Sequence, residues 1–251
     1  MYNMTILNLV GGFMQTVLIT GGSRGIGKAM VELFSKEGYR VAFTYKSSEN
    51  EAKILAEKTG ALAIRADSAN ESEVIDAVRS ATDALGCIDC LINNAGISSF
   101  SLFTDLTLEE WERCLRVNLT GAFIYSKAVI PGMVSRKNGS IINISSMWGL
   151  VGSSCEVHYS TAKAALIGMT KALAKELGPS GIRVNAIAPG VISTDMNRSL
   201  DDQSMKALVE ETPLMKIGLP NDVARAALFL ASENASFITG EIMNVSGGFV
   251  I

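Results

Sequence analysis

The feature that most restricts the fold is a regular alternation of short apolar runs and longer amphipathic stretches, which begins at Thr16 and continues to the C-terminus. Strands that helices cover on both faces contain unbroken apolar runs, whereas strands with one solvated face alternate polar and apolar residues. The apolar runs predict strands at 16–20, 40–45, 62–66, 90–93, 140–144, 183–188 and 241–245. The amphipathic stretches predict helices at 25–37, 49–58, 71–85, 108–136, 157–177 and 221–232. This order predicts an α/β fold, with a Rossmann-type doubly wound parallel sheet of about seven strands and helices on both faces.

Two signals concern the long helical pattern at 108–136. Thr107 and Glu110 have the spacing of a capping box, which predicts that a helix begins after Thr107. Pro131 lies inside the pattern, where it removes a backbone N–H group, and it predicts a kink or an early end of the helix.

Nothing in the sequence divides the chain, because it has no internal repeat and no linker rich in proline or glycine. We expect one domain over residues 14–251, preceded by a flexible N-terminal extension at residues 1–13. Residues 192–219 are polar, lack a regular pattern and lie between two proline-containing turns. Long insertions of this kind commonly form lids, so we expect a substrate lid here, with a plain surface excursion as the alternative.

Composition excludes several classes of function. The 251 residues include 22 Lys and Arg and 25 Asp and Glu, so we expect no nucleic-acid or acidic-membrane surface. The apolar run at 6–14 is too short to span a membrane and lacks the basic start of a signal peptide. With a single histidine we expect no metal site. Cys87 and Cys90 are spaced like a redox or zinc pair but fit the entry of an apolar strand better, which favours reduced thiols and a cytoplasmic location.

A glycine-rich turn follows the first predicted strand and opens the first predicted helix. Residues 20–27 read Thr-Gly-Gly-Ser-Arg-Gly-Ile-Gly. Glycines allow a tight turn and a close approach of the backbone to a pyrophosphate, and the helix N-terminus supplies unpaired N–H groups for the phosphates. The position of this turn between a strand and a helix predicts a dinucleotide-binding site.

The spacing of Gly21, Gly25 and Gly27 resembles the TGxxxGxG turn of the short-chain dehydrogenase/reductase family. Residues 93–96, Asn-Asn-Ala-Gly, resemble the NNAG motif of that family, and 189–194 resembles the segment that holds the nicotinamide amide. The matching motifs extend from Met14 to the C-terminus. The resemblance implies a nicotinamide-dependent oxidoreductase that forms a homotetramer.

The same resemblance implies four catalytic residues, Asn118, Ser146, Tyr159 and Lys163. Tyr159 and Lys163 are four residues apart on a predicted helix, so their side chains project from one face. A phenol has a pKa of about 10, and a nearby ammonium would lower that pKa so that the hydroxyl can exchange a proton with a substrate oxygen. Ser145 competes with Ser146 for the role of donor to a carbonyl oxygen. Asn118 would hold a water in a proton relay, or would form hydrogen bonds in the core.

The end of the second predicted strand bears on the choice of cofactor. NAD-binding proteins place an acid there for the ribose 2′-hydroxyl, but residues 45–48 are Tyr-Lys-Ser-Ser and carry none. Lys46 and Arg24 would meet a 2′-phosphate, so we expect NADP(H) as cofactor and reduction as the direction. Asp67 resembles the adenine-contacting aspartate of the family, with helix capping as the alternative. The cofactor-binding residues expected on these grounds are Gly21, Ser23, Arg24, Gly25, Ile26, Gly27, Tyr45, Lys46, Asp67, Ser68, Asn94, Ala95, Gly96, Tyr159, Lys163, Pro189, Gly190, Ile192 and Thr194.

The resemblance therefore implies an NADPH-dependent reductase of a small-molecule or carrier-bound ketone. Within the family the chain is most similar to the branch that reduces 3-oxoacyl thioesters on acyl carrier protein in fatty-acid synthesis. Residues 146–149 and 154–158 depart from that branch and are similar to reductases of the 5-aminopentanone modification on elongation factor P. Glu156 would then meet a substrate amine, or it would be a solvated charge. His158 would contact the substrate or lie on the surface. Trp148 would line the substrate pocket or pack in the core. A catalytically silent dinucleotide-binding protein is the alternative from a different class.

Overall fold

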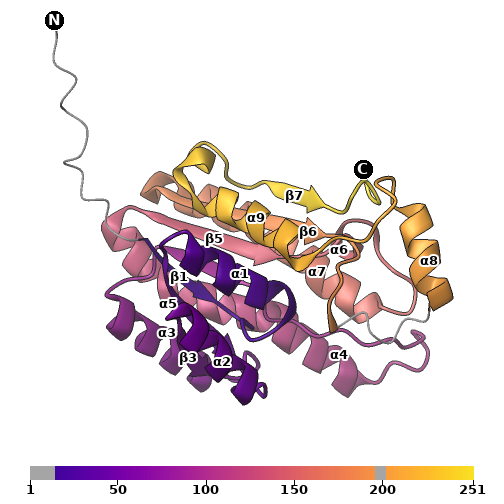
Figure 1. Ribbon diagram of the computed structural model, residues 1–251, viewed down its shortest axis with the longest axis horizontal. Helices are drawn as coiled ribbons and strands as arrows, with labels where there is room; N and C mark the ends of the chain where they lie inside the picture. Colours follow the sequence, from indigo (N-terminus) through magenta and orange to yellow (C-terminus); the bar gives the residue numbers. More distant parts are fainter. Residues whose placement is uncertain (1–14, 196–201) are drawn as a thin grey trace, which may run out of the picture.

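The computed structural model describes residues 15–195 and 202–251 (Figure 1), so the predicted extension at 1–13 lies outside the described residues. The strands form one sheet in the order β3-β2-β1-β4-β5-β6-β7, and every neighbouring pair is parallel. They are β1 (Thr16–Ile19), β2 (Arg40–Tyr45), β3 (Leu62–Arg65), β4 (Cys90–Asn93), β5 (Gly139–Ile144), β6 (Ile182–Pro189) and β7 (Ile242–Val245). The predicted doubly wound α/β fold is confirmed, and each strand lies within one residue of its predicted bounds.

Helices cover both faces of this sheet (Figure 1). One face packs against α1 (Gly25–Lys36), α2 (Glu49–Thr59) and α9 (Pro220–Ala231), and the other against α3 (Glu71–Leu85), α5 (Gly121–Arg136) and α7 (Val157–Leu177). The shorter elements are α4 (Leu108–Leu115), α6 (Trp148–Val151), α8 (Asp202–Glu211), a π-helical turn η1 (Arg116–Thr120), and the 3₁₀ turns η2 (Gly178–Ser180) and η4 (Glu233–Ala235). No helix within the described residues combines the length and apolar character needed to cross a bilayer.

The first strand shows why apolar runs in this chain are unbroken. Val17 and Ile19 are fully buried in the core cluster that contains Phe34 of α1. Leu18, between them, is fully buried in the opposite cluster, which contains Tyr125 of α5. Because successive side chains of a strand point to opposite faces, a strand covered on both faces needs an apolar residue at every position.

The predicted helix at 108–136 is interrupted at a place that the sequence does not indicate. Thr107 and Glu110 form the predicted capping box of α4. The helix then changes to the wider π-helical turn η1 before α5 begins. The expectation of an early end at Pro131 is wrong, since α5 continues to Arg136. Pro131 and Lys127 are both exposed, so the Lys127 carbonyl that loses its helical partner can bind water instead.

The segment predicted as an irregular lid contains a helix, α8, which the sequence analysis missed. Ile192 pairs with Gly218 in a parallel bridge, and the Gly218 N–H donates to the carbonyl of Val191 at 2.9 Å, so the two ends of this excursion lie together. Residues 196–201 are outside the described ranges, and the role of 192–219 as a lid stays a prediction.

The cysteine pair near β4 packs in the way that its apolar surroundings predict. Cys90 is buried in the core cluster of β1, and Cys87 is half-buried beside Thr16. All four cysteines are free thiols. Within the described part of the chain, no three His, Cys, Asp or Glu side chains are grouped so that they could hold a metal ion.

Gly121, the first residue of α5, has no room for a side chain. An added Cβ would lie 2.6 Å from the backbone carbonyl oxygen of Ser68, which follows β3. We expect Gly121→Ala to lower the free energy of unfolding by about 1–3 kcal/mol, measured by urea denaturation. Gly168→Ala in α7 is the matched control, because nothing lies within 4 Å of its added Cβ. It should raise the free energy of unfolding by about 0.5–1 kcal/mol, and equal effects of the two substitutions would contradict this account.

Candidate active site

Four chain segments at the carboxyl ends of strands meet at one edge of the sheet. The strands are parallel, so their carboxyl ends share an edge, and ligands of open α/β sheets bind there. The glycine-rich turn follows β1, the segment 94–96 follows β4, Ser145 and Ser146 follow β5, and Pro189 ends β6. Other predicted cofactor residues lie in the same segments, with Ser23 and Ile26 around the start of α1 and Gly190 and Ile192 after β6, while Tyr45 ends β2 and Ser68 follows β3.

The glycine-rich turn between β1 and α1 is held against β2, because the Gly21 N–H donates to the Thr44 hydroxyl at 3.3 Å and the Gly22 N–H donates to the Thr44 carbonyl at 2.8 Å. Gly21 and Gly25 adopt φ of +65° and +53°, a region that favours glycine, and a Cβ on Gly27 would lie 2.2 Å from the Gly21 carbonyl oxygen. α1 begins after Arg24 without any side-chain cap, so its first N–H groups are available to an anion. The turn therefore fits the pyrophosphate of a dinucleotide, and Thr194 lies over it, with its methyl group 3.4 Å from the position of a Cβ on Gly25.

The turn after β4 is tied to the glycine-rich turn. The backbone N–H groups of Asn94 and Ala95 both donate to the Thr20 hydroxyl at 2.9 Å. The Asn94 amide donates to the carbonyls of Thr20 at 2.9 Å and Gly21 at 3.1 Å. These bonds hold the two turns at a fixed separation, on either side of the expected cofactor position.

The structure brings three of the predicted catalytic residues together. Tyr159 and Lys163 are buried on α7, and the Lys163 ammonium lies 5.5 Å from the centre of the Tyr159 ring and donates to the Ile144 carbonyl at 2.9 Å. Ser146 is buried and interacts with the Tyr159 hydroxyl. Ser145 instead donates its hydroxyl hydrogen to the Lys163 carbonyl at 2.8 Å, which leaves Ser146 as the serine that faces Tyr159.

Asn118 lies in η1, where its side chain is occupied by the neighbouring loop. Its amide donates to the carbonyls of Ile97 at 2.9 Å and Cys114 at 3.0 Å, and its oxygen accepts from the Ile97 N–H at 3.2 Å. A Cβ on Gly96 would lie 2.6 Å from this oxygen and 3.4 Å from the Lys163 nitrogen, so Asn118, Gly96 and Lys163 are neighbours. The hydrogen-bonding role in the core is thus observed, and the proton relay stays a prediction.

Burial dominates the acid–base properties of the site. It raises the pKa of Tyr159 above its ordinary value; the Ser146 hydroxyl opposes this, and the charges of Glu156 and Cys114 add to it. Burial also lowers the pKa of Lys163 to about 8. The expected lowering of the pKa of the Tyr159 phenol is therefore not observed, because desolvation of the enclosed side chain is the largest effect.

The two basic residues expected near a 2′-phosphate lie on the open side of the site. Arg24 is exposed, and the Lys46 ammonium pairs with the Asp67 carboxylate at 2.6 Å. Although partial burial would raise the pKa of Asp67, hydrogen bonds from Lys46 and the Ala69 N–H lower it. The N-cap of α3 is Asn70 and not Asp67, so helix capping does not explain the aspartate.

Two side chains expected near the substrate are enclosed rather than solvated. Glu156 accepts a hydrogen bond from the Ser98 hydroxyl, and the Nε2 of His158 is 2.9 Å from the Ser99 hydroxyl oxygen. Glu156 is 5% exposed and His158 is 0% exposed. The alternatives that made Glu156 a solvated charge and placed His158 on the surface are therefore wrong. Sequence reasoning missed Ser98 and Ser99, because nothing in their own pattern indicates that the loop after β4 folds over the start of α7.

Trp148, two residues after Ser146, contacts the end of the chain. Its ring meets that of Phe249 edge to face, with 5.7 Å between the ring centres. The residues after β7 thus form part of the wall beside the candidate site.

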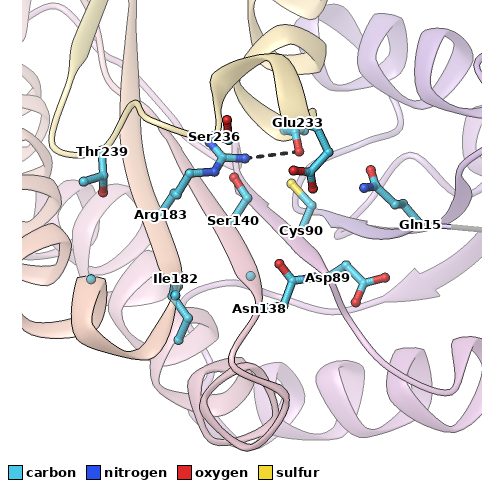
Figure 2. Close-up of a pocket in the computed structure, with 14 residues that line it drawn as sticks. Gln15, Asp89, Cys90, Asn138, Ser140, Ile182, Arg183, Glu233, Ser236 and Thr239 are labelled. Atoms are coloured by element: carbon cyan, nitrogen blue, oxygen red, sulfur yellow. Dashed lines mark hydrogen bonds between the residues drawn. The ribbon is translucent and has the colours of Figure 1, made fainter. Parts of the chain in front are cut away.

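A separate polar hollow lies at the opposite, amino edge of the sheet (Figure 2). Its lining includes Gln15, Cys90, Ser140 and Arg183. The Arg183 guanidinium donates to the carbonyl of Leu230 at 2.7 Å and to those of Ala231 and Ser232 at 3.3 Å. Because these bonds complete the last turn of α9, the arginine serves the fold, and the hollow is not the candidate active site.

Comparisons with known proteins agree with this geometry. The sequence profile described as Enoyl-(Acyl carrier protein) reductase matches residues 21–250. The 3-oxoacyl-[acyl-carrier-protein] reductase of Synechocystis sp. is 41% identical over 243 residues, covering 94% of this chain and 97% of that protein. The 3-oxoacyl-[acyl-carrier-protein] reductase FabG of Aquifex aeolicus is 42% identical over 236 residues, covering 92% and 95%. The solved structure of a double mutant of a Serratia marcescens short-chain dehydrogenase/reductase superposes with a TM-score of 0.89 at 34% identity, covering 94% and 97%.

The buried ammonium of Lys163 makes stability depend on pH in a defined direction. Its pKa is about 8 when folded and 10.5 as the ordinary value, so between these pH values the unfolded chain binds more protons than the folded one. Stability from this group therefore rises with pH in that window. Relative to Lys163→Met, the wild-type free energy of unfolding should rise by about 2 kcal/mol from about pH 8 to about pH 10, measured by urea denaturation. If the free energies of unfolding of the wild type and of Lys163→Met changed with pH in parallel, this role of the Lys163 ammonium would be contradicted.

Proposed function

Because this chain belongs to the short-chain dehydrogenase/reductase family, we propose that it is an NADPH-dependent reductase of a 3-oxoacyl thioester on acyl carrier protein. The observation that carries the proposal is the meeting of Ser146, Tyr159 and Lys163 beside an uncapped glycine-rich turn. Relatives of similar length named as 3-oxoacyl-[acyl-carrier-protein] reductases support the substrate class. The proposal includes a role in fatty-acid synthesis, a cytoplasmic location and a homotetramer, as the family resemblance implies.

The cofactor would be held by the turns at the carboxyl edge. The first N–H groups of α1 would bind its pyrophosphate, and Arg24 and Lys46 would bind a 2′-phosphate, for which Lys46 would exchange its present partner Asp67. Lys163 would contact the ribose on the nicotinamide side. When bound, the reduced nicotinamide supplies a hydride to the carbonyl carbon.

The side chains of this site are suited to handling the proton at the carbonyl oxygen. Ser146 would donate a hydrogen bond to that oxygen and fix its position. Tyr159, whose pKa burial holds above the ordinary value, remains protonated and would give its proton to the developing alkoxide. The Lys163 ammonium below the ring would then stabilise the phenolate that results.

Tyr159→Phe tests this function directly, because it removes the proposed proton donor with little change of shape. We expect wild-type protein to oxidise NADPH faster than NADH with acetoacetyl-acyl carrier protein, and the variant to be slower by about 100-fold or more. Turnover is followed by NADPH absorbance, and binding of NADPH by fluorescence. The variant should still bind NADPH, which separates lost chemistry from lost folding. Full activity of the variant, or failure of the wild type to bind either cofactor, would overturn the proposal.

A second substrate is favoured by one observation, the enclosed carboxylate of Glu156. It is 5% exposed, and none of the ion pairs found among the described residues involves it. Burying a charge without a partner of opposite sign is costly, and a cationic group of the substrate would supply that partner. The 5-aminopentanone modification of elongation factor P joins a ketone to an amine and fits this requirement.

Activity on the modified factor distinguishes the two substrates. If this second proposal is correct, NADPH is oxidised with elongation factor P that carries the modification and not with the unmodified factor. Glu156→Gln should then lower kcat/KM for the modified factor by about 10-fold or more, because the charge pair is lost. Its kcat/KM for acetoacetyl-acyl carrier protein at neutral pH should stay unchanged. No oxidation with the modified factor leaves the 3-oxoacyl thioester as the proposed substrate.

A further inference from the structure

Glu156 holds an enclosed carboxylate close to Tyr159 in the sequence, and the 3-oxoacyl reduction proposed above does not use it. It is the residue before α7 and its carboxylate is enclosed, and within residues 15–195 and 202–251 the side chain that hydrogen-bonds to it is the hydroxyl of Ser98 in the loop after β4. A hydroxyl donor satisfies part of a carboxylate but does not neutralise it. The negative charge therefore acts on neighbours through a medium of low dielectric.

The neighbour best placed to feel this charge is Tyr159. Glu156 is the residue before α7 and Tyr159 is the third residue of that helix, so the two lie about one turn apart. Both are almost fully enclosed, at 5% and 8% exposure. The charge of Glu156 also reaches Cys114 on α4, whose thiol packs in one cluster with Tyr159 and whose pKa burial and this charge both raise.

The groups that face the Tyr159 hydroxyl come from three elements. Glu156 immediately precedes α7, Cys114 comes from α4, and Ser146 follows β5, while the Lys163 ammonium, one turn further along α7, lies 5.5 Å from the centre of the Tyr159 ring. Lys163 favours the phenolate, and Glu156 favours the neutral phenol. Tyr159 thus lies between opposite charges whose balance sets when it releases its proton.

We propose that Glu156 is a positioning residue that keeps the Tyr159 hydroxyl protonated until a substrate oxygen arrives. The inference rests on the proposed role of Tyr159 as proton donor. A donor that ionises before substrate binds has no proton to give, so the Glu156 charge extends the range of alkaline pH over which the reductase works. The hydrogen bond from Ser98 fixes the carboxylate in place, and the charge itself produces the effect.

Ionisation of Tyr159 can be measured without turnover. Phenolate absorbance is titrated upward in pH in protein saturated with NADP⁺, and the contribution of Tyr159 is the difference between each protein and the same protein carrying Tyr159→Phe. We expect Glu156→Gln to move this ionisation to lower pH by about one unit. Glu156→Asp, which keeps the charge, and Ser98→Ala, which keeps the carboxylate, should titrate much closer to the wild type. The same order should be seen in the alkaline limb of kcat/KM for acetoacetyl-acyl carrier protein.

Identical titrations of the wild type and Glu156→Gln would overturn the inference. An equal downward shift in Ser98→Ala and Glu156→Gln would also overturn it, because it would show that the geometry of the loop and not the charge controls Tyr159. Absence of ketone reduction by the wild type would count against the proposed function alone, since the titration decides the effect of Glu156 without substrate.

Discussion

The parallel pairing of β1 with both β2 and β4 is the constraint on which the rest of the structure depends. Strand order reverses at this point, because the chain first extends the sheet to one side, through β2 and β3, and then to the other, through β4 to β7. Crossovers that leave in opposite directions open a crevice at the carboxyl ends of the two strands. The bonds between Asn94, Ala95 and Thr20 fix the width of that crevice. The uncapped start of α1 lies at this crevice, and Ser146 and Tyr159 lie at the same edge.

The candidate site concentrates unfavourable electrostatics inside a well-packed protein. Glu156 immediately before α7 and Tyr159 and Lys163 on that helix follow one another at intervals of about one turn, and each is 8% exposed or less. Desolvation pushes the pKa of Lys163 down and that of Tyr159 up, so neither group has the acid strength it would have in water. The core clusters on both faces of the sheet provide the rigidity that keeps these groups enclosed. The candidate catalytic groups therefore lie at the carboxyl edge of the sheet, whereas the apolar clusters on its two faces provide the stability.

Much of this arrangement could be predicted from the sequence, because it depends on local patterns. Unbroken apolar runs located every strand, and the glycine spacing located the tight turn between β1 and α1, where an added Cβ on Gly27 would meet the Gly21 carbonyl oxygen. The π-helical turn at Asn118 was not predictable, because one extra residue in a turn leaves the apolar period almost unchanged. The burial of Glu156 and His158 was equally hidden. It results from two serines about 58 residues earlier in the chain, and contacts at that distance leave no periodic signal.

The contact between Trp148 and Phe249 has a consequence for how this protein can be handled. The chain enters the sheet at the amino edge, where Gln15 precedes β1, and it leaves at the carboxyl edge, beside the candidate site. A purification tag or a surface tether joined on the N-terminal side of Gln15 emerges at the edge farthest from Ser146. A peptide fused after Ile251 would instead begin two residues beyond the aromatic pair that lies next to that serine. Fusions and immobilised forms that are meant to remain active belong on the N-terminal side.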